Sequence, residues 1–247
     1  MTGGWVETGV YGGSNYTGTL EGDVKMVITG GQVGTDASHI GYVHGGGYGQ
    51  PTIVKGNVDV TLGTRNTTTG VTSGSAVVYG DVYGGSALGS VNGTSKSNTL
   101  HTNVTLNAGT INGNLYGGAL GSNSVAANVY APVQVTVNGG EAKNVFGCNN
   151  VNGMPQSTVN VLMTGGEVHE CVYGGGNAAP YTGDPKVKMT GGTVDQSVFG
   201  GGLGSEATIT GNTHVIITGT SHVKQNVYGG GNGGSVSGQT HVDIGGE

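Results

Sequence analysis

A short motif that ends in glycine recurs eight times along the chain. Each copy has an aliphatic residue, then an aromatic residue or a histidine, then one or more glycines. A tandem repeat of this kind is typical of a solenoid, in which each unit buries its apolar side against its neighbours. The repeat constrains the fold more than any other feature of the sequence. The copies begin at Val10, Val43, Val82, Leu115, Val145, Val172, Val198 and Val227.

The composition agrees with a folded all-β chain. Glycine accounts for 55 of 247 residues but proline for only 5, and no Gly-X-Y period is present, which excludes collagen. Apolar residues recur regularly between the glycines, which argues against disorder. Most of the remaining residues are Thr, Ser, Asn and Val, which favour strands and turns rather than helices.

The stretch Val187–Val215 shows one unit most clearly. Three strand-like segments alternate with three glycine corners, and alternation along the first segment points Val187 and Met189 inward and Lys188 outward. In neighbouring copies, Val215, Ile217, Val135, Val137, Val242 and Ile244 would also point inward, and Ile216 outward. This pattern predicts an all-β, right-handed parallel β-helix of about eight triangular coils. The expected segments are 187–190, 194–199 and 207–210, and the expected corners are 190–192, 200–202 and 211–212.

The unit length varies, which predicts where loops leave the coil. Gly165 and Gly191 are 26 residues apart, whereas the equivalent Gly30 and Gly74 are 44 apart. Coils are therefore expected to span roughly 26–44 residues, and the extra length should project from one face. The candidate loops are Thr64–Ser73 and Asn92–His101.

The chain is expected to be one β-helix repeat domain, residues 1–247. Its first residues, Met1–Gly4, match Met163–Gly166, and its last segment, His241–Glu247, restarts the unit that begins at His214. The two ends therefore have nearly the same phase, which predicts a fragment of a longer protein. Neither end has a polar capping unit, so we expect head-to-tail self-association.

The tandem order of Thr-Gly-Gly-x-Val and Val-Tyr-Gly-Gly-Gly-Asn, as in Thr190–Val194 and Val172–Asn177, resembles the glycine-rich β-helical repeats of large bacterial surface and secreted proteins. Adhesins and the passenger domains of autotransporters are similar in organisation. The resemblance covers essentially the whole chain, and it implies an extracellular or cell-surface location. It transfers no catalytic residue.

The aromatic column of the motif is the candidate ligand-facing site. If its rings are exposed, Tyr83, Tyr116, Tyr173 and Tyr228 would form a platform on which sugars stack. The alternative is a packed ladder that covers the glycine-rich corners and stabilises the fold through ring contacts. Phe146 and Phe199 replace tyrosine in two units, so the hydroxyl is dispensable there.

The sequence predicts no metal site and no cofactor. His214 and His241 hold the same position in successive units, but two imidazoles without a third ligand make a weak site. The tandem Gly-Gly-x-Gly-x-Asp pattern of calcium-binding β-helices is absent. The threonine column before the glycine pair is one residue wide, too narrow for an ice-binding face.

Charge and hydropathy argue against several other functions. The net charge is −6 with 8 basic residues spread along the chain, so no basic face for nucleic acid can be assembled. No apolar run of about 18 residues suggests a membrane span. Carboxylates are scattered, Arg65 is the only arginine, and no nucleophile motif stands out, so no catalysis is expected.

Two functions fit these observations. The first is a structural or adhesive module of a bacterial cell-surface or secreted protein, with host or bacterial surface glycans or proteins as partners. The alternative is a carbohydrate-binding or carbohydrate-active β-helix, similar to a phage tail spike or a polysaccharide lyase.

Cys148 and Cys171 are the only cysteines. Cys148 follows its ring position by two residues and Cys171 precedes the next one by two, so the thiols are offset by about 13 Å if the segment is extended. A disulfide needs Cα atoms within about 7 Å. The sequence therefore predicts two free, mostly buried thiols.

Overall fold

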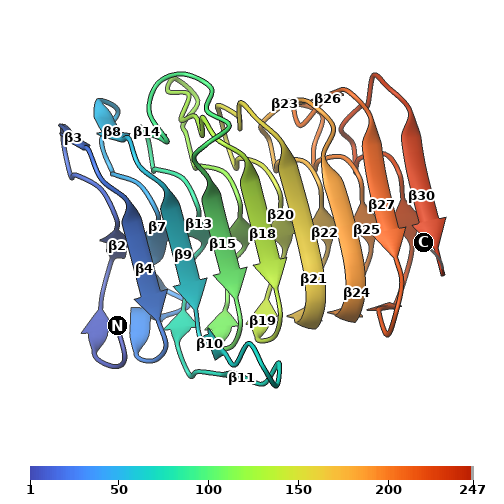
Figure 1. Cartoon of the computed structure of the whole chain (residues 1–247), viewed down its shortest axis with the longest axis horizontal. Coiled ribbons are helices and arrows are strands. Elements are labelled where there is room, and N and C mark those ends of the chain that lie inside the picture. The colour runs from blue at the N-terminus through green and yellow to red at the C-terminus, as the bar shows by residue number, and fades with distance from the viewer. Residues whose placement is uncertain (246–247) are drawn as a thin grey trace.

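The computed structural model describes residues 1–245, which form a single stack of β-coils (Figure 1). Strands, turns and bends account for this part of the chain, and no helix occurs in it. One sheet contains a strand from each of eight successive coils, and all of its strands pair in parallel. The predicted all-β solenoid of about eight coils is confirmed. Gly246 and Glu247, which belong to the predicted restart of the unit, lie outside the described residues.

The first wall of each coil is a parallel strand that faces the viewer in Figure 1; it has five residues, except where β21 and β24 continue into the second wall. Neighbouring strands pair without a shift, so that Val58 lies beside Val24 and Val104 beside Val60. Like residues therefore stack on like residues along the axis. The strands are β4 (Val24–Ile28), β9 (Val58–Leu62), β15 (Thr102–Leu106), β18 (Val133–Val137), β21 (Val159–Val168), β24 (Lys186–Val194), β27 (Thr213–Ile217) and β30 (Thr240–Ile244).

The second wall continues from the first around a glycine corner. β21 and β24 run through this corner without interruption, and Gly166 and Gly192 adopt positive φ there, 80° and 88°. Only glycine takes up such a conformation at little cost, which explains the second glycine of the pairs Gly165-Gly166 and Gly191-Gly192. The other strands of this wall are β1 (Trp5–Val6), β5 (Gln32–Asp36), β12 (Val77–Val78), β16 (Thr110–Ile111), β19 (Glu141–Ala142) and β28 (His222–Val223).

The third wall carries the repeated aliphatic–aromatic pair. Its glycines are required by close packing, because a Cβ on Gly117 would lie 2.5 Å from the carbonyl oxygen of Gly147 in the next coil. The strands are β2 (Gly9–Tyr11), β7 (Tyr42–His44), β13 (Val82–Tyr83), β17 (Leu115–Tyr116), β20 (Val145–Phe146), β22 (Val172–Tyr173), β25 (Val198–Phe199) and β29 (Val227–Tyr228).

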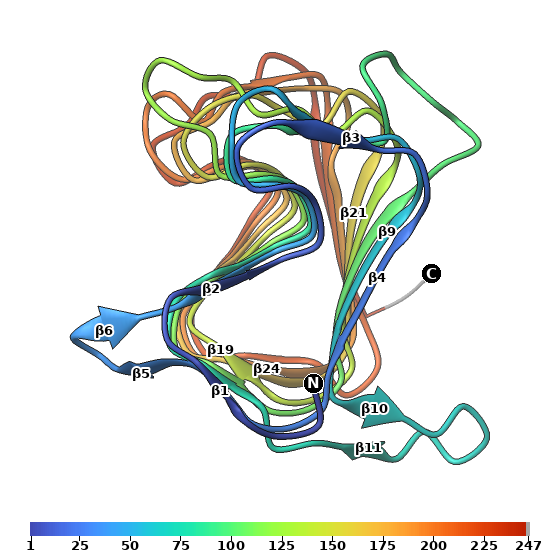
Figure 2. The same cartoon turned by 90° about the vertical axis from the view of Figure 1, so that its left-hand side faces the viewer.

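The cross-section is indented rather than a plain triangle. In the end-on view, the chain bends inward after the third wall before it reaches a short fourth side (Figure 2). The predicted segment 194–199 is two strands, the end of β24 and β25, separated by a bend at residues 195–197 between the second and third walls. The fourth side consists of β3 (Gly18–Leu20), β8 (Thr52–Val54), β14 (Ser90–Val91), β23 (Tyr181–Thr182) and β26 (Ile209–Thr210).

Alternating residues of the first wall fill the interior of the coil as predicted. Val187, Met189, Val215 and Ile217, with Val135 and Val137, belong to one continuous apolar core. Val242 and Ile244 pair with Val215 and Ile217 and so lie on the same inward-facing side, but they are 39% and 69% exposed because no further coil covers them.

Ile216 points outward as predicted, since it is not part of the interior core, but it is nevertheless buried. Lys188 and Asp243 flank it on the neighbouring strands. The aliphatic stem of a lysine such as Lys188 can cover an outward apolar residue, which helps to account for its burial.

Both predicted loops leave the coil. Thr64–Ser73 forms an antiparallel hairpin of β10 (Thr64–Arg65) and β11 (Thr72–Ser73) that projects from the stack (Figure 2). Asn92–His101 connects β14 to β15 and is largely exposed. The sequence did not predict a third projection, in which β6 (His39–Ile40) pairs antiparallel with the end of β5.

The two cysteines are free and buried, as predicted. Cys148 belongs to the interior core, whereas Cys171 packs with the aromatic side chains on the other side of the third wall. The wall itself therefore separates the two thiols. Within residues 1–245, no helix has the length and apolar character that crossing a membrane would require.

Candidate functional site

The aromatic residues of the third wall form one stacked column that runs through all eight coils. Successive ring centroids are 4.6–5.1 Å apart and the ring planes are within 11° of parallel. This spacing matches the distance between neighbouring strands, so the backbone pairing sets the stacking. We call this column the aromatic ladder: Tyr11, His44, Tyr83, Tyr116, Phe146, Tyr173, Phe199 and Tyr228.

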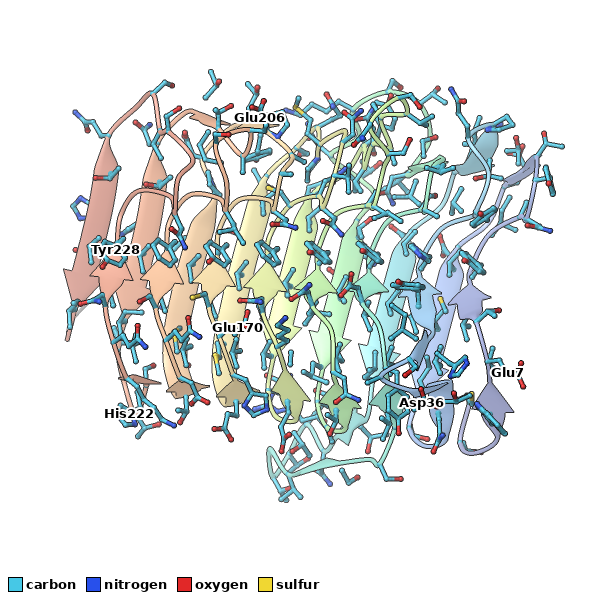
Figure 3. All side chains as sticks on the ribbon, turned by 180° about the vertical axis from the view of Figure 1, so that it is seen from behind. Glu7, Asp36, Glu170, Glu206, His222 and Tyr228 are labelled. Atoms are coloured by element: carbon cyan, nitrogen blue, oxygen red, sulfur yellow. The ribbon has the colours of Figure 1, made fainter. Side chains whose placement is uncertain are left out.

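The aromatic ladder lies outside the coil interior. In each strand the aliphatic residue, such as Val82, points into the interior core, and the next residue, Tyr83, points to the opposite side. Figure 3 shows a row of rings along this side of the stack that ends at Tyr228. Leu120 and Leu203, from the segments that follow the wall, pack against them.

Three of the four predicted ligand-facing residues are buried. Tyr83, Tyr116 and Tyr173 are at most 2% exposed, and both faces of each ring are covered by neighbouring rings. A sugar has no access to these faces while the coils are stacked. Tyr228, in the last copy of the wall, is 45% exposed, and Tyr11, in the first, is 37% exposed. The ladder is thus packed through its middle and open at its ends.

Asparagine side chains bond the tyrosine hydroxyls of the ladder. The Tyr83 hydroxyl donates to Oδ2 of Asp81 at 2.8 Å and accepts from Nδ2 of Asn150 at 2.8 Å. Asn232 donates to the Tyr173 hydroxyl at 3.4 Å. The Tyr116 hydroxyl accepts from Nδ2 of Asn114, in its own coil, at 3.4 Å. Buried hydroxyls therefore have partners, as a stable interior requires.

Asn150 and Asn232 each come from the second coil along, not from the adjacent one. Asn150 follows the ring of its own coil, Phe146, by four residues, and that coil lies two beyond the coil of Tyr83. The equivalent position two coils beyond Phe146 is Leu203, so the ring without a hydroxyl is matched by an apolar residue. Across two coils, an amide side chain is thus matched with a tyrosine hydroxyl, and a leucine is matched with a phenylalanine ring.

Burial dominates the electrostatics of the ladder. It raises the pKa of Tyr83, Tyr116 and Tyr173 well above that of a free tyrosine. It lowers the pKa of His44 to about 3, so this imidazole is neutral at physiological pH. Nδ1 of His44 is buried without a hydrogen-bond partner. Leu120 holds the matching position two coils further on, where a donor to His44 would otherwise stand.

A second arrangement, on the outer face of the second wall, escaped the sequence analysis. Nε2 of His169 lies 3.4 Å from a Glu141 carboxylate oxygen, and its Nδ1 lies 3.5 Å from Asp195, which also pairs with Lys224 at 2.7 Å. The signal was available, because Lys143, His169 and Asp195 follow one another at intervals of 26 residues, one coil length. Charged residues that are one coil length apart in the sequence therefore lie side by side in one column on the folded chain.

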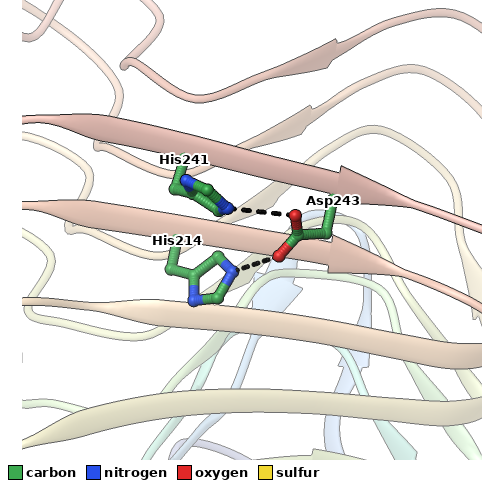
Figure 4. Close-up of side chains that lie close together, drawn as sticks. All are labelled: His214, His241 and Asp243. Carbon is green, nitrogen blue, oxygen red and sulfur yellow. Dashed lines mark hydrogen bonds and ion pairs between the residues drawn. The ribbon is translucent and has the colours of Figure 1, made fainter. Parts of the chain in front are cut away.

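A third arrangement lies on the outer face of the first wall near its C-terminal end (Figure 4). Nε2 of His214 is 2.7 Å from Oδ2 of Asp243, and Nε2 of His241 is 3.0 Å from Oδ1 of the same carboxylate. These hydrogen bonds, the one from His214 first among them, lower the pKa of Asp243. The sequence showed the histidine pair but not Asp243, although Asp243 follows His241 by two residues on the same face of a strand.

Among residues 1–245, two groups of side chains have three metal-ligating donors close together. One is His214, His241 and Asp243; the other contains Glu167, His169 and Asp195. No protein-family model matches this chain, and neither a curated protein nor a solved structure matches it. The fold therefore defines the class of protein by itself: a parallel β-solenoid with an aromatic ladder along one side.

Proposed function

We propose that this chain is a structural or adhesive repeat module of a bacterial cell-surface or secreted protein. The observation that carries the proposal is the continuity of packing along the axis. The interior core and the aromatic ladder both run from coil to coil, in register, over the whole stack. Such a stack resists bending and presents a long surface, which are the properties that a stalk or an adhesive arm needs.

The outer surface supports the same proposal. The walls carry threonine, asparagine and paired charges, and two hairpins project from the coils. Projections on one repeat of a solenoid are commonly where it meets its partners. We therefore infer that surface glycans or proteins are the partners, in an extracellular or cell-surface setting.

One observation favours a second candidate, carbohydrate binding at the open end of the ladder. A hollow beside the half-exposed Tyr228 is lined by amide side chains and a second ring. A ring face together with amides that both donate and accept hydrogen bonds suits a sugar. The residues that line this hollow include Phe199, Gln196, Gln225, Asn226 and Asn232.

One experiment separates the adhesive module from a carbohydrate-active enzyme. Beads coated with the chain are tested for retention on bacterial and host cells and on a glycan array, and the soluble chain is incubated with polysaccharides in a reducing-sugar assay. The proposal expects retention without release of reducing ends. Release of reducing ends, or no retention on any surface, would refute the adhesive role.

Tyr228→Ala tests the second candidate. If the open ladder end binds sugars, this variant loses glycan-array binding while bead retention through the hairpins persists. Tyr16→Ala is a matched control, because Tyr16 is 79% exposed and lies outside the ladder. Equal glycan binding by both variants would exclude the ladder end as the sugar site.

A further inference from the structure

The first wall presents two imidazoles and a carboxylate on one outer surface. His214 in β27 pairs directly with His241 in β30, so their backbones are held side by side as neighbours in a parallel sheet. Asp243 follows His241 by two residues and therefore projects from the same face of β30. The two imidazole centroids are 4.9 Å apart and the ring planes are nearly perpendicular. Figure 4 shows both Nε2 atoms directed at the carboxylate between them.

We propose that His214, His241 and Asp243 form a binding site for a divalent transition-metal cation of the Zn²⁺ and Cu²⁺ class. Two imidazole nitrogens and one carboxylate oxygen are a donor set that these ions prefer. All three donor atoms lie within 4.8 Å of one another. Zinc bonds of about 2.0–2.1 Å place tetrahedral ligand atoms roughly 3.4 Å apart. The separations of 2.7 Å from His214 Nε2 to Oδ2 and of 3.0 Å from His241 Nε2 to Oδ1 would each need to widen by less than an ångström for a carboxylate that offers both oxygens.

The surroundings leave room for the ion. The side chains of His214, His241 and Asp243 are 36%, 66% and 40% exposed, so water can complete the coordination. Both histidines line a hollow whose wall also includes Asp184 and Lys186. The positive charge of Lys186 disfavours a bound cation, and the negative charge of Asp184 offsets this repulsion. Because two hydrogen-bonded strands fix the backbone of all three ligands, little chain ordering is needed on binding.

The group around His169 provides an internal comparison. It also combines imidazole and carboxylates, but Lys224 already lies 2.7 Å from the Asp195 carboxylate. A metal ion there would have to compete with a bound ammonium group. We therefore expect the ion to bind preferentially to His214, His241 and Asp243. A variant of His169 is the matched control.

The test is zinc titration of the tag-free chain after treatment with a chelator, followed by calorimetry. The wild-type chain is expected to bind one Zn²⁺. His241→Gln and Asp243→Asn should each weaken binding at least tenfold, and His169→Gln should leave it within about twofold. Titration with Co²⁺ gives a second readout, because its visible absorption reports nitrogen and oxygen ligands directly.

Each outcome bears on the proposal. All three substituted side chains lie on the outer surface, so the circular dichroism spectra should match that of the wild type. Should one variant unfold, His214→Gln tests the same ligand set from the neighbouring strand. No zinc binding by the wild type, equal binding by His241→Gln, or loss of binding in His169→Gln would overturn the proposal.

Discussion

The middle and the ends of the aromatic ladder have the same residue types in different surroundings. Tyr173 is 2% exposed between two rings, whereas Tyr228 in the last copy is 45% exposed. The change from exposed to buried occurs within a single coil, because Tyr11 is half-exposed and its neighbour His44 is only 2% exposed. A ring of the ladder is therefore buried only where a coil lies on each side of it. The same position of the repeat is part of the core in one coil and part of the surface in another.

The largest expected effect comes from removing a ring in the middle. Tyr173→Ala should lower the free energy of unfolding by about 3–5 kcal/mol, since the ring is packed on both faces. Tyr228→Ala should cost less than about 1 kcal/mol, because one face already meets solvent. Chemical denaturation of both variants measures the difference. Equal losses would contradict the contrast between middle and end.

The next effect concerns acid sensitivity near the N-terminal end. The pKa of His44 is lowered by burial to about 3, whereas in the unfolded chain it is about 6.5. Above pH 6.5 the group is neutral in both states. As the pH falls from 6.5 towards 3, only the unfolded chain takes up the proton, so stability is lost. At pH 5 this loss amounts to about 2 kcal/mol.

His44→Phe should remove this loss, because a phenyl ring stacks in the same column, as Phe146 does. Relative to the wild type, the variant should gain about 2 kcal/mol between pH 7 and pH 5. Thermal denaturation at both pH values measures it. His222→Phe, at an exposed position in β28, is the matched control. A constant difference between His44→Phe and the wild type at the two pH values would show that His44 is not buried as a neutral ring.

A smaller effect is expected from the amides that cover the ladder. Asn150→Ala leaves the Tyr83 hydroxyl without its donor and Asn177 Nδ2 without its acceptor. The expected cost is about 1–2 kcal/mol. Asn15 holds the equivalent position in the first coil but is exposed, so Asn15→Ala should stay within about 0.5 kcal/mol. If denaturation shows the same cost for both, the amides are not part of the packed middle.

The smallest effect on folding is expected at the C-terminal end of the stack. A substitution there should change the association of one chain with another rather than the stability of the fold. Val242 and Ile244 in the last strand are exposed, as uncovered parts of the interior face. We predict concentration-dependent head-to-tail association, measured by sedimentation velocity, which Ile244→Lys should weaken. Thr68→Lys, in the exposed hairpin, adds the same charge elsewhere and should not. A strict monomer at high concentration would contradict the prediction.

Strand alternation and unit length were readable from the sequence because both are local. The inward positions of Val187 and Met189 follow from a period of two, and the loop at Thr64–Ser73 follows from excess length. The indentation did not follow, because it depends on how the glycine runs bend. Whether Tyr83 is exposed was equally hidden, since residues two coils away cover it. Asp243 was missed because its contact with His214 depends on the side-chain conformations of two neighbouring strands, not on its position in the sequence alone.

The hydrogen bonds from Asn150 and Asn232 to rings two coils earlier give the stack a direction. As a chain emerges residue by residue, the hydroxyl of Tyr83 finds its amide partner only when Asn150 has followed. Tyr173 likewise waits for Asn232. At both places the ring therefore lacks its amide donor until the second following coil has formed. Such an order would make coiling proceed from the first coil to the last, with each of these hydrogen bonds forming two coils behind the growing end.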